Sequence, residues 1–163
     1  MSPESNKVLD AAVKIVNEIR SRALNSEMFT ALCESMDSQH QHLLFHAGVR
    51  WLSRGRVLSR LFELKEEAKQ FLQEANSSLT ELLSDEIWTR KLAYLADIFC
   101  RLNELSISFQ GFSTNIFGLR SKTDAFKKKL PLWHSHLEMF PNLHDFLISA
   151  DVNRKELLCI IIL

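Results

Sequence analysis

The segment His46–Phe62 contains the residues of this chain best suited to binding an anion. It has no acidic residue and a local net charge of +4, in a chain whose 20 basic and 20 acidic side chains cancel; the charge comes from Arg50, Arg54, Arg56 and Arg60. Arginines four residues apart on a helix can grip phosphates together. Trp51 offers a face on which an unpaired base can stack. The pattern indicates a nucleic-acid surface, and the competing interpretation is a solvated helix face beside one core tryptophan.

A second basic cluster lies further along the chain. It consists of Lys122, Lys127, Lys128 and Lys129, and the one acidic residue among them is Asp124. Three consecutive lysines on a helix are typical of a solvated face, which is the interpretation we favour for this cluster.

Three histidines follow Cys33 and raise the question of a metal site: His40, His42 and His46. Structural zinc sites use ligands paired at tight spacing, such as C-x2-C or H-x3–5-H. Only His42 and His46 have a separation that suits one face of a helix. We therefore expect a polar connector here, with no metal and no cofactor.

The sequence carries no recognisable catalytic motif. It lacks a glycine-rich phosphate loop, an H-E-x-x-H motif and a G-x-S-x-G motif. The clustered acids Glu63, Glu66 and Glu67 stand beside Lys65 and Lys69, as solvated charge ladders on helices do. We predict that the chain is not an enzyme and that it acts by binding.

The composition is that of a folded protein from a reducing compartment. Apolar residues make up 46% and charged residues 25% of the 163 residues, which suffices for one hydrophobic core. Cys33, Cys100 and Cys159 form no close pair and are expected to be free thiols. The longest apolar run, Leu157–Leu163, is much shorter than the roughly 20 residues that span a bilayer. We predict an intracellular chain without a membrane partner.

Helices must position these residues, because four glycines and three prolines leave few turns. We predict one helix over Glu4–Ala23 and a second that begins after a cap at Asn25 or Ser26 and ends near Asp37. A third is expected over Ser53–Glu74. A short helix should follow, opened by a capping box of Ser78 and Glu81.

The next predicted helix runs from a cap at Ser84 to Gly111. Its apolar residues keep a spacing of about seven that is typical of a helical bundle: Trp88, Leu92, Leu95, Phe99, Leu102 and Phe109. A further helical segment extends from Ile116 to Phe140, and Pro131 predicts a kink or break within it.

Five stretches of the sequence resemble the helical region of domesticated transposases of the hAT superfamily. They are His46–Leu64 (HAGVRWLSRGRVLSRLFEL), Lys91–Phe99 (KLAYLADIF), Leu102–Leu105, Gln110–Gly111 and Ala125–Leu130. The resemblance covers the chain from about Val8 to Phe146. It implies the all-α insertion region of a ribonuclease-H-like transposase, with the catalytic core absent.

The same resemblance implies a role for two of the site residues. Arg50 and Trp51 match a pair that lies close to transposon-end DNA in the family, where the tryptophan stabilises a base displaced from the duplex. The partner implied is DNA with hairpin or single-stranded ends, and the location implied is the nucleus. The family's catalytic acids and its zinc-coordinating finger match no segment of this chain, so we expect a catalytically inactive product, shortened or differently terminated relative to the family.

These observations predict an all-α helical bundle of five or six helices over residues 1–150, followed by a divergent apolar tail over 151–163. The function expected is nucleic-acid binding through Arg50, Trp51, Arg54, Arg56 and Arg60. Two alternatives remain open. One is an interaction module whose exposed stripe, Leu92–Phe109, pairs with a protein partner or with a second copy of the chain. The other is a transposon relic with no selected function.

Overall fold

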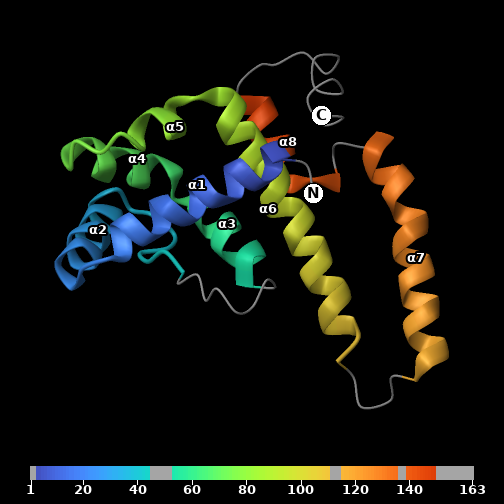
Figure 1. Ribbon diagram of the computed structural model, residues 1–163. Coiled ribbons are helices and arrows are strands. Elements are labelled where there is room, and N and C mark those ends of the chain that lie inside the picture. Colours follow the sequence, from blue (N-terminus) through green and yellow to red (C-terminus); the bar gives the residue numbers. More distant parts are fainter. Residues whose placement is uncertain (1–2, 45–52, 111–114, 136–138, 150–163) are drawn as a thin grey trace.

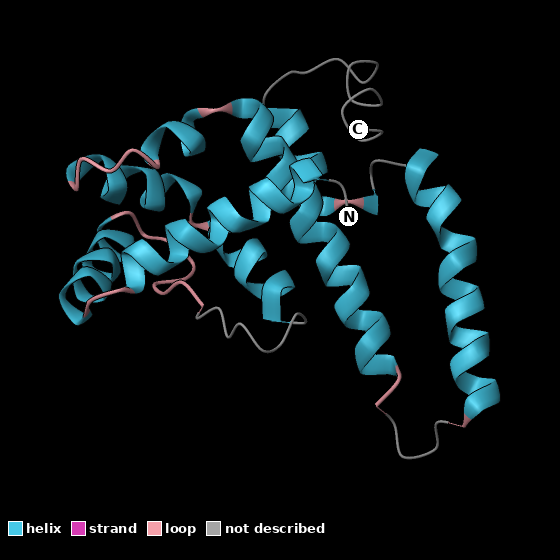
Figure 2. Ribbon diagram, viewed as in Figure 1, coloured by secondary structure: helices cyan, strands magenta, loops and turns pink. Residues whose placement is uncertain are grey.

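The computed structural model describes residues 3–44, 53–110, 115–135 and 139–149, which form helices joined by turns and short connectors (Figures 1 and 2). Within these ranges there is no strand, and the helices are α1 (Pro3–Arg20), α2 (Ala23–Ser35), α3 (Ser53–Glu63), α4 (Lys65–Glu74), α5 (Thr80–Ser84), α6 (Glu86–Ser108), α7 (Ile116–Ser135) and α8 (Pro141–Ser149). The predicted all-α class is confirmed. The helices outnumber the five or six expected because one predicted helix is divided and because α8 follows α7 as a separate element.

Helix α6 is the centre of the bundle. It contacts α1, α3, α5, α7 and α8. The regularly spaced apolar residues predicted for this helix form the core here, since Leu92, Leu95 and Phe99 are at most 6% exposed. The hypothesis that this stripe pairs with another chain is therefore wrong for Leu92–Phe99, which the chain's own helices cover. Beyond Phe99 the helix is half-buried or exposed.

Helices α3 and α6 approach each other closely at Gly55. A Cβ atom at this position would lie 3.0 Å from both the carbonyl carbon and the carbonyl oxygen of Phe99. Glycine is the residue that allows such an approach between two backbones. Val57, Leu58 and Leu61 then bury the inward face of α3.

The predicted helix Ser53–Glu74 is divided at Leu64, which has φ −99° and ψ 28°. Its hydrogen bonds nevertheless continue, because Leu64 donates to the Arg60 carbonyl at 3.1 Å and accepts from Ala68 at 2.9 Å. Leu64 is 2% exposed. Both parts contact α1, but their other partners differ, since α3 packs on α6 while α4 contacts α2 and α5. The junction contains no glycine or proline, so we attribute the division of the helix to these tertiary contacts.

Helices α2 and α4 are each followed by a residue in the left-handed backbone conformation, with a positive φ angle. Among residues that carry a side chain, asparagine and aspartate adopt this conformation most readily. Asp37 has φ 54° and Asn76 has φ 52°. After each, a backbone N–H bonds back over the last turn, from Ser38 to the Cys33 carbonyl at 3.0 Å and from Ser77 to the Leu72 carbonyl at 2.9 Å. The predicted end of the second helix near Asp37 is confirmed.

Three predicted N-terminal caps are wrong. Helix α2 begins at Ala23 without a side-chain cap, so Asn25 lies inside the helix, where its amide group donates to the Glu18 carbonyl at 3.3 Å. Helix α5 lacks the predicted capping box; the Leu79 N–H donates to Ser77 Oγ at 3.3 Å. Helix α6 is capped by Asp85, whose carboxylate accepts from the Ile87 N–H at 2.9 Å, in place of Ser84.

Helix α7 forms a hairpin with the C-terminal half of α6 and lies at the edge of the molecule (Figure 1). It continues through Pro131, so the predicted break did not occur. A series of aromatic rings ties it to the bundle: Phe126 and Trp133 have centroids 5.1 Å apart, Trp133 and Phe140 6.4 Å, and Phe140 and Tyr94 5.4 Å. Gly111, Cys159 and the tail 151–163 lie outside the described residues. None of the described helices has the length and apolarity required to cross a bilayer.

Candidate nucleic-acid interface

The predicted site begins in a part of the chain that the structure does not describe. Arg50 and Trp51 lie outside the described residues. Arg54 is in the first turn of α3, and its side chain is likewise outside them. Arg56 is exposed and Arg60 is half-buried, both on α3. The geometry of the site is therefore that of α3 and of these two arginines.

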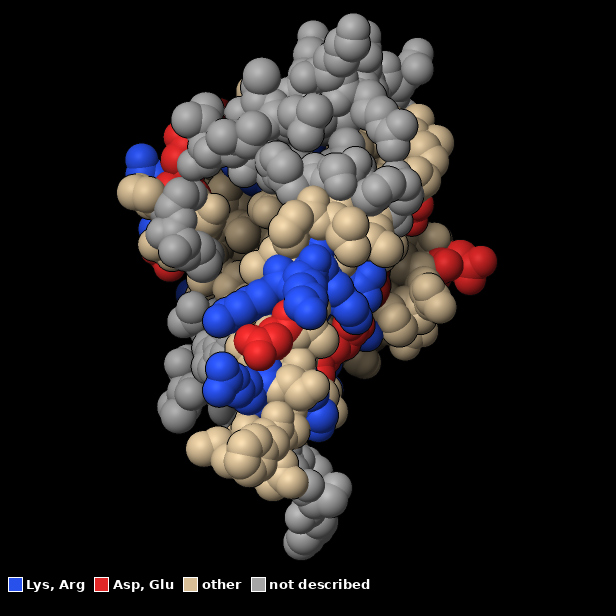
Figure 3. Space-filling view, turned by 90° about the vertical axis from the view of Figure 1, so that its right-hand side faces the viewer, with Lys and Arg blue, Asp and Glu red and all other residues tan. Residues whose placement is uncertain are grey.

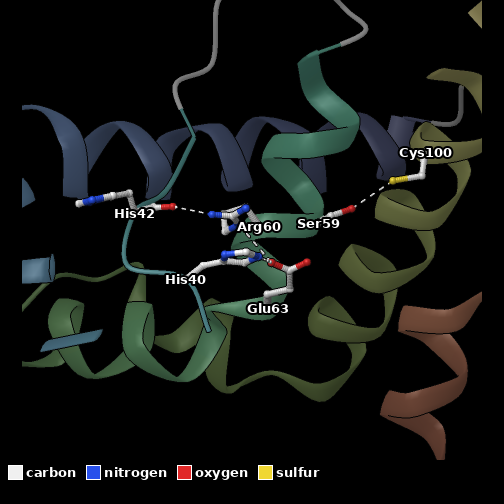
Figure 4. A network of polar contacts seen from close by, with 6 residues as sticks. All are labelled: His40, His42, Ser59, Arg60, Glu63 and Cys100. Atoms are coloured by element: carbon white, nitrogen blue, oxygen red, sulfur yellow. Dashed lines mark hydrogen bonds and ion pairs between the residues drawn. The ribbon is translucent and has the colours of Figure 1, made fainter. Parts of the chain in front are cut away.

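Helix α3 is held against α6, and this packing fixes the position of the helix that carries the arginines. Besides the contact at Gly55, the Ser59 hydroxyl lies 3.2 Å from Cys100 Sγ on α6, and both residues are shown in Figure 4. Because Gly55 faces α6, its chain neighbours Arg54 and Arg56 are placed to either side of the contact, about 100° around the helix axis. The first turn of α3 also carries no acid, and the positive end of the helix dipole favours a nearby anion.

Arg60 differs from Arg56 in its environment. Its Nε donates to Glu63 Oε2 at 3.1 Å, and its Nη1 donates to the His42 carbonyl at 3.3 Å (Figure 4). His40 Nε2 lies 3.5 Å from the same carboxylate oxygen. Arg60 therefore tethers the connector before α3 to the helix, and its charge is balanced by Glu63. Arg56 has no such neighbour among the described residues' hydrogen bonds and ion pairs.

The predicted histidine cluster behaves as a connector where it is described. His42 Nδ1 lies 3.0 Å from Thr30 Oγ1, while His40 faces Glu63 on α3, and His46 lies outside the described residues. Cys33 points into the core, and burial, aided by Glu67, raises the pKa of its thiol to about 11. A neutral thiol is a poor metal ligand. In the described part of the chain, no group of three or more His, Cys, Asp or Glu residues is placed to hold a metal ion.

A second basic surface covers α7, where Lys and Arg side chains gather on the face shown in Figure 3. Lys127, Lys128 and Lys129 are exposed, as the sequence predicted for a solvated face. Arg120, which the sequence reasoning did not single out, joins them and lies 3.9 Å from Asp124. Its position about two turns before Lys127 is the signal that could have placed it on the same helix.

Comparisons with known proteins agree on one family. Residues 3–138 match the model of the FAM200/GTF2IRD2 helical domain. The chain is also 39% identical over 149 residues to the general transcription factor II-I repeat domain-containing protein 2 of Bos taurus. That alignment covers 91% of this chain and 16% of the relative, so the chain spans about a sixth of the relative's length. No solved structure matches.

The family match extends from α1 to the end of α7 and includes the arginine-rich segment and the central helix. It confirms the resemblance to domesticated transposase-derived proteins. The chain belongs to the FAM200/GTF2IRD2 helical-domain family of transposase-derived proteins.

Proposed function

We propose that this chain is a non-enzymatic helical module that binds DNA with single-stranded or hairpin ends through the segment Arg50–Arg60. The observation that supports this most directly is the exposed Arg56 on a helix whose inward face is fixed against α6. A guanidinium held on a rigid element loses little entropy when it meets a phosphate. Arg50 and Arg54 add charge to the same stretch of chain, and Trp51 supplies the stacking ring.

The family relationship supports the same proposal. The bovine relative is named as a general transcription factor repeat protein, which fits work on DNA in the nucleus. The resemblance to hAT transposases adds the displaced base as the feature that Trp51 binds. Catalytic chemistry is left to other proteins in this proposal, because the sequence offers no set of acids arranged for it.

Fluorescence anisotropy with a labelled hairpin-ended oligonucleotide tests the proposal. We expect the affinity to fall steeply as salt rises, because cations on the protein displace counterions from phosphates. Trp51→Ala should weaken binding by about 1–3 kcal/mol, the usual contribution of one stacked base. Arg22→Ala, which removes an exposed cation from the start of α2, is the matched control and should bind as the wild type does.

Two outcomes would contradict this function. One is the absence of binding at micromolar protein, and the other is binding that does not depend on salt. A fully paired blunt duplex that binds as well as the hairpin-ended probe would remove the stacking role of Trp51 and leave only phosphate contacts.

A further inference from the structure

The hairpin of α6 and α7 exposes an unusual amount of apolar surface. Six of the eleven large apolar side chains that are exposed in the described part of the chain lie on the C-terminal half of α6, on α7 or four residues after α7: Ile107, Ile116, Phe117, Leu130, Leu132 and Met139. Ile116 and Phe117 are 75% and 80% exposed. On the preceding part of the same α6, by contrast, Leu92, Leu95 and Phe99 are covered. None of the described helices therefore covers these side chains of the hairpin.

A groove of about 510 Å³ runs between the two helices of this hairpin. Its apolar part is formed by Leu105 of α6, by Phe126 and Leu132 of α7 and by Met139. Lys129 lies along its α7 side, and Lys122, also on α7, donates from Nζ to the Ser108 carbonyl of α6. The groove thus combines an apolar floor with a cationic rim.

The charge around the groove points to an acidic occupant. Helix α7 has five basic residues and one acid, a net charge of +4 in a neutral chain. On the α6 side, Glu104 already pairs with Arg101 at 3.3 Å. A second copy of the chain would bring another α7 of the same charge against this one, and like charges disfavour that contact.

The apolar floor distinguishes between acidic partners. A nucleic acid would satisfy Lys122 and Lys129 but would leave Leu132 and Met139 facing phosphates or water. An amphipathic helix places leucines at i, i+3, i+4 and i+7 on one face and acids at the margins of that face. It therefore matches both the floor and the rim.

We propose that the groove between α6 and α7 binds an acidic amphipathic helix of a partner protein. Its apolar face packs on Leu105, Phe126 and Leu132, and its carboxylates lie beside Lys122 and Lys129. The bound helix completes a three-helix bundle with the hairpin. This surface is separate from the arginines of α3, so the inference stands whether or not the chain binds DNA.

A designed peptide titrated into the full chain tests the proposal. The probe is a fluorescein-labelled helix of about 18 residues, roughly five turns, with leucines on one face and glutamates elsewhere. Two control peptides accompany it. In one the same residues are scrambled so that no apolar face forms, and in the other lysine replaces glutamate. We expect binding of the first peptide only.

Charge and shape variants locate the binding surface. Leu132→Glu and Lys129→Glu each change an exposed residue of the groove and should weaken peptide binding about tenfold or more, as loss of one central contact does. Leu24→Glu on α2 and Lys14→Glu on α1 make the same changes at exposed positions elsewhere. These two should bind the peptide as the wild type does. Circular dichroism of each variant verifies that the fold is retained.

Several results would overturn the inference. They are equal binding of the scrambled peptide, binding of the lysine peptide, no binding at micromolar protein, or full binding by Leu132→Glu. Displacement of the peptide by a single-stranded oligonucleotide would identify the groove as a nucleic-acid surface instead. A concentration-dependent dimer in sedimentation that Leu132→Glu dissociates would identify a second copy as the occupant.

Discussion

The buried carboxylate of Asp97 on α6 accepts a hydrogen bond from the backbone N–H of Leu143, in the first turn of α8, at 3.0 Å. The backbone N–H and the side-chain amide of Asn142 donate to the same carboxylate at 3.3 and 2.7 Å. The first N–H groups of a helix have no partner within that helix and carry a partial positive charge. Asp97 thus caps α8 from a different helix and fixes where α8 packs on α6.

Asp97→Ala should therefore destabilise the protein. The change leaves the N–H of Leu143 without its acceptor in a buried position and removes a charge-assisted bond, a loss of about 2 kcal/mol. Urea unfolding measures this loss. Asp145→Ala removes an exposed acid from α8 itself and should change the stability by less than about 0.5 kcal/mol. Equal effects of the two variants would mean that Asp97 does not cap α8.

The pH dependence of stability should also carry a contribution from Asp97. Burial raises the pKa of its carboxyl group, although the hydrogen bonds from Leu143 and Asn142 oppose the shift. A raised folded-state pKa means that the folded protein holds this proton more tightly than the unfolded chain does. The stabilisation is complete below the ordinary aspartate pKa and is lost as pH rises through the raised value.

Urea unfolding at a series of pH values, with wild type and Asp97→Asn in parallel, measures this contribution. The difference in stability between the two should change across that window and become constant above it. Glu4 should contribute a pH dependence of stability with the opposite sign and serves as the control, because its hydrogen bond and ion pair with Lys91 lower the pKa of its carboxyl group. Its stabilisation is present above the ordinary glutamate pKa and is lost as pH falls. Parallel curves for wild type and Asp97→Asn would contradict the assignment.

Gly55→Ala should weaken the contact between α3 and α6. The new methyl group would meet the Phe99 backbone at 3.0 Å, and overpacking of this kind costs about 1–3 kcal/mol. This outweighs the gain of about 1 kcal/mol in helix propensity. Gly118→Ala on α7 is the matched control, because its methyl group meets no backbone atom and only the side-chain oxygen of Asn115, at 3.3 Å. Thermal unfolding should rank Gly55→Ala clearly below Gly118→Ala.

Cys33 should resist alkylation in the folded protein. Burial, followed by the charge of Glu67, raises the pKa of its thiol to about 11. At pH 8 the thiolate fraction is then about a hundredfold lower than for a free cysteine, so iodoacetamide should label it at least that much more slowly in buffer than in urea. Cys100, half-buried beside Ser59, is the internal reference. Peptide mass spectrometry follows both sites, and equal rates for Cys33 in buffer and in urea would contradict its burial.

Much of the fold was predictable because it depends on periodicity. The stripe from Trp88 to Phe99 identified the core helix correctly, and Asp37 marked the end of α2. The division at Leu64 was not predictable, since the sequence there has neither glycine nor proline and the cause is the pair of surfaces on which α3 and α4 pack. The predicted cap at Asn25 was wrong because α2 begins earlier, at Ala23, which places Asn25 inside the helix.

The candidate site was predictable in composition but not in environment. Spacing alone made Arg56 and Arg60 equivalent members of one cationic face. The structure separates them, because Glu63 and the carbonyl of His42, which lies 18 residues earlier, both reach Arg60. Exposure of Phe117 was likewise hidden, since apolar spacing on α7 does not reveal how little of it α6 covers.

The two described arginines of the site should respond differently to substitution. Arg60→Ala removes hydrogen bonds to Glu63 and to the His42 carbonyl, and should lower the free energy of unfolding by about 1 kcal/mol. Arg56→Ala should leave stability within about 0.5 kcal/mol of wild type. If Arg56 contacts a phosphate, its loss weakens oligonucleotide binding at every sequence and reduces the salt slope by about 1. Urea unfolding and anisotropy on the same samples separate the two roles.

Glu63→Gln completes this set, because it keeps the size of the side chain while removing the charge that holds Arg60. Glu63 competes with any phosphate for the Arg60 guanidinium, so we expect the variant to bind the oligonucleotide slightly more tightly than wild type. Arg60→Ala combined with Glu63→Gln should abolish that gain. If Arg60→Ala alone instead weakens binding more than Arg56→Ala and leaves stability unchanged, then the contact between Arg60 and Glu63 opens on binding, and Arg60 is the principal phosphate ligand of α3.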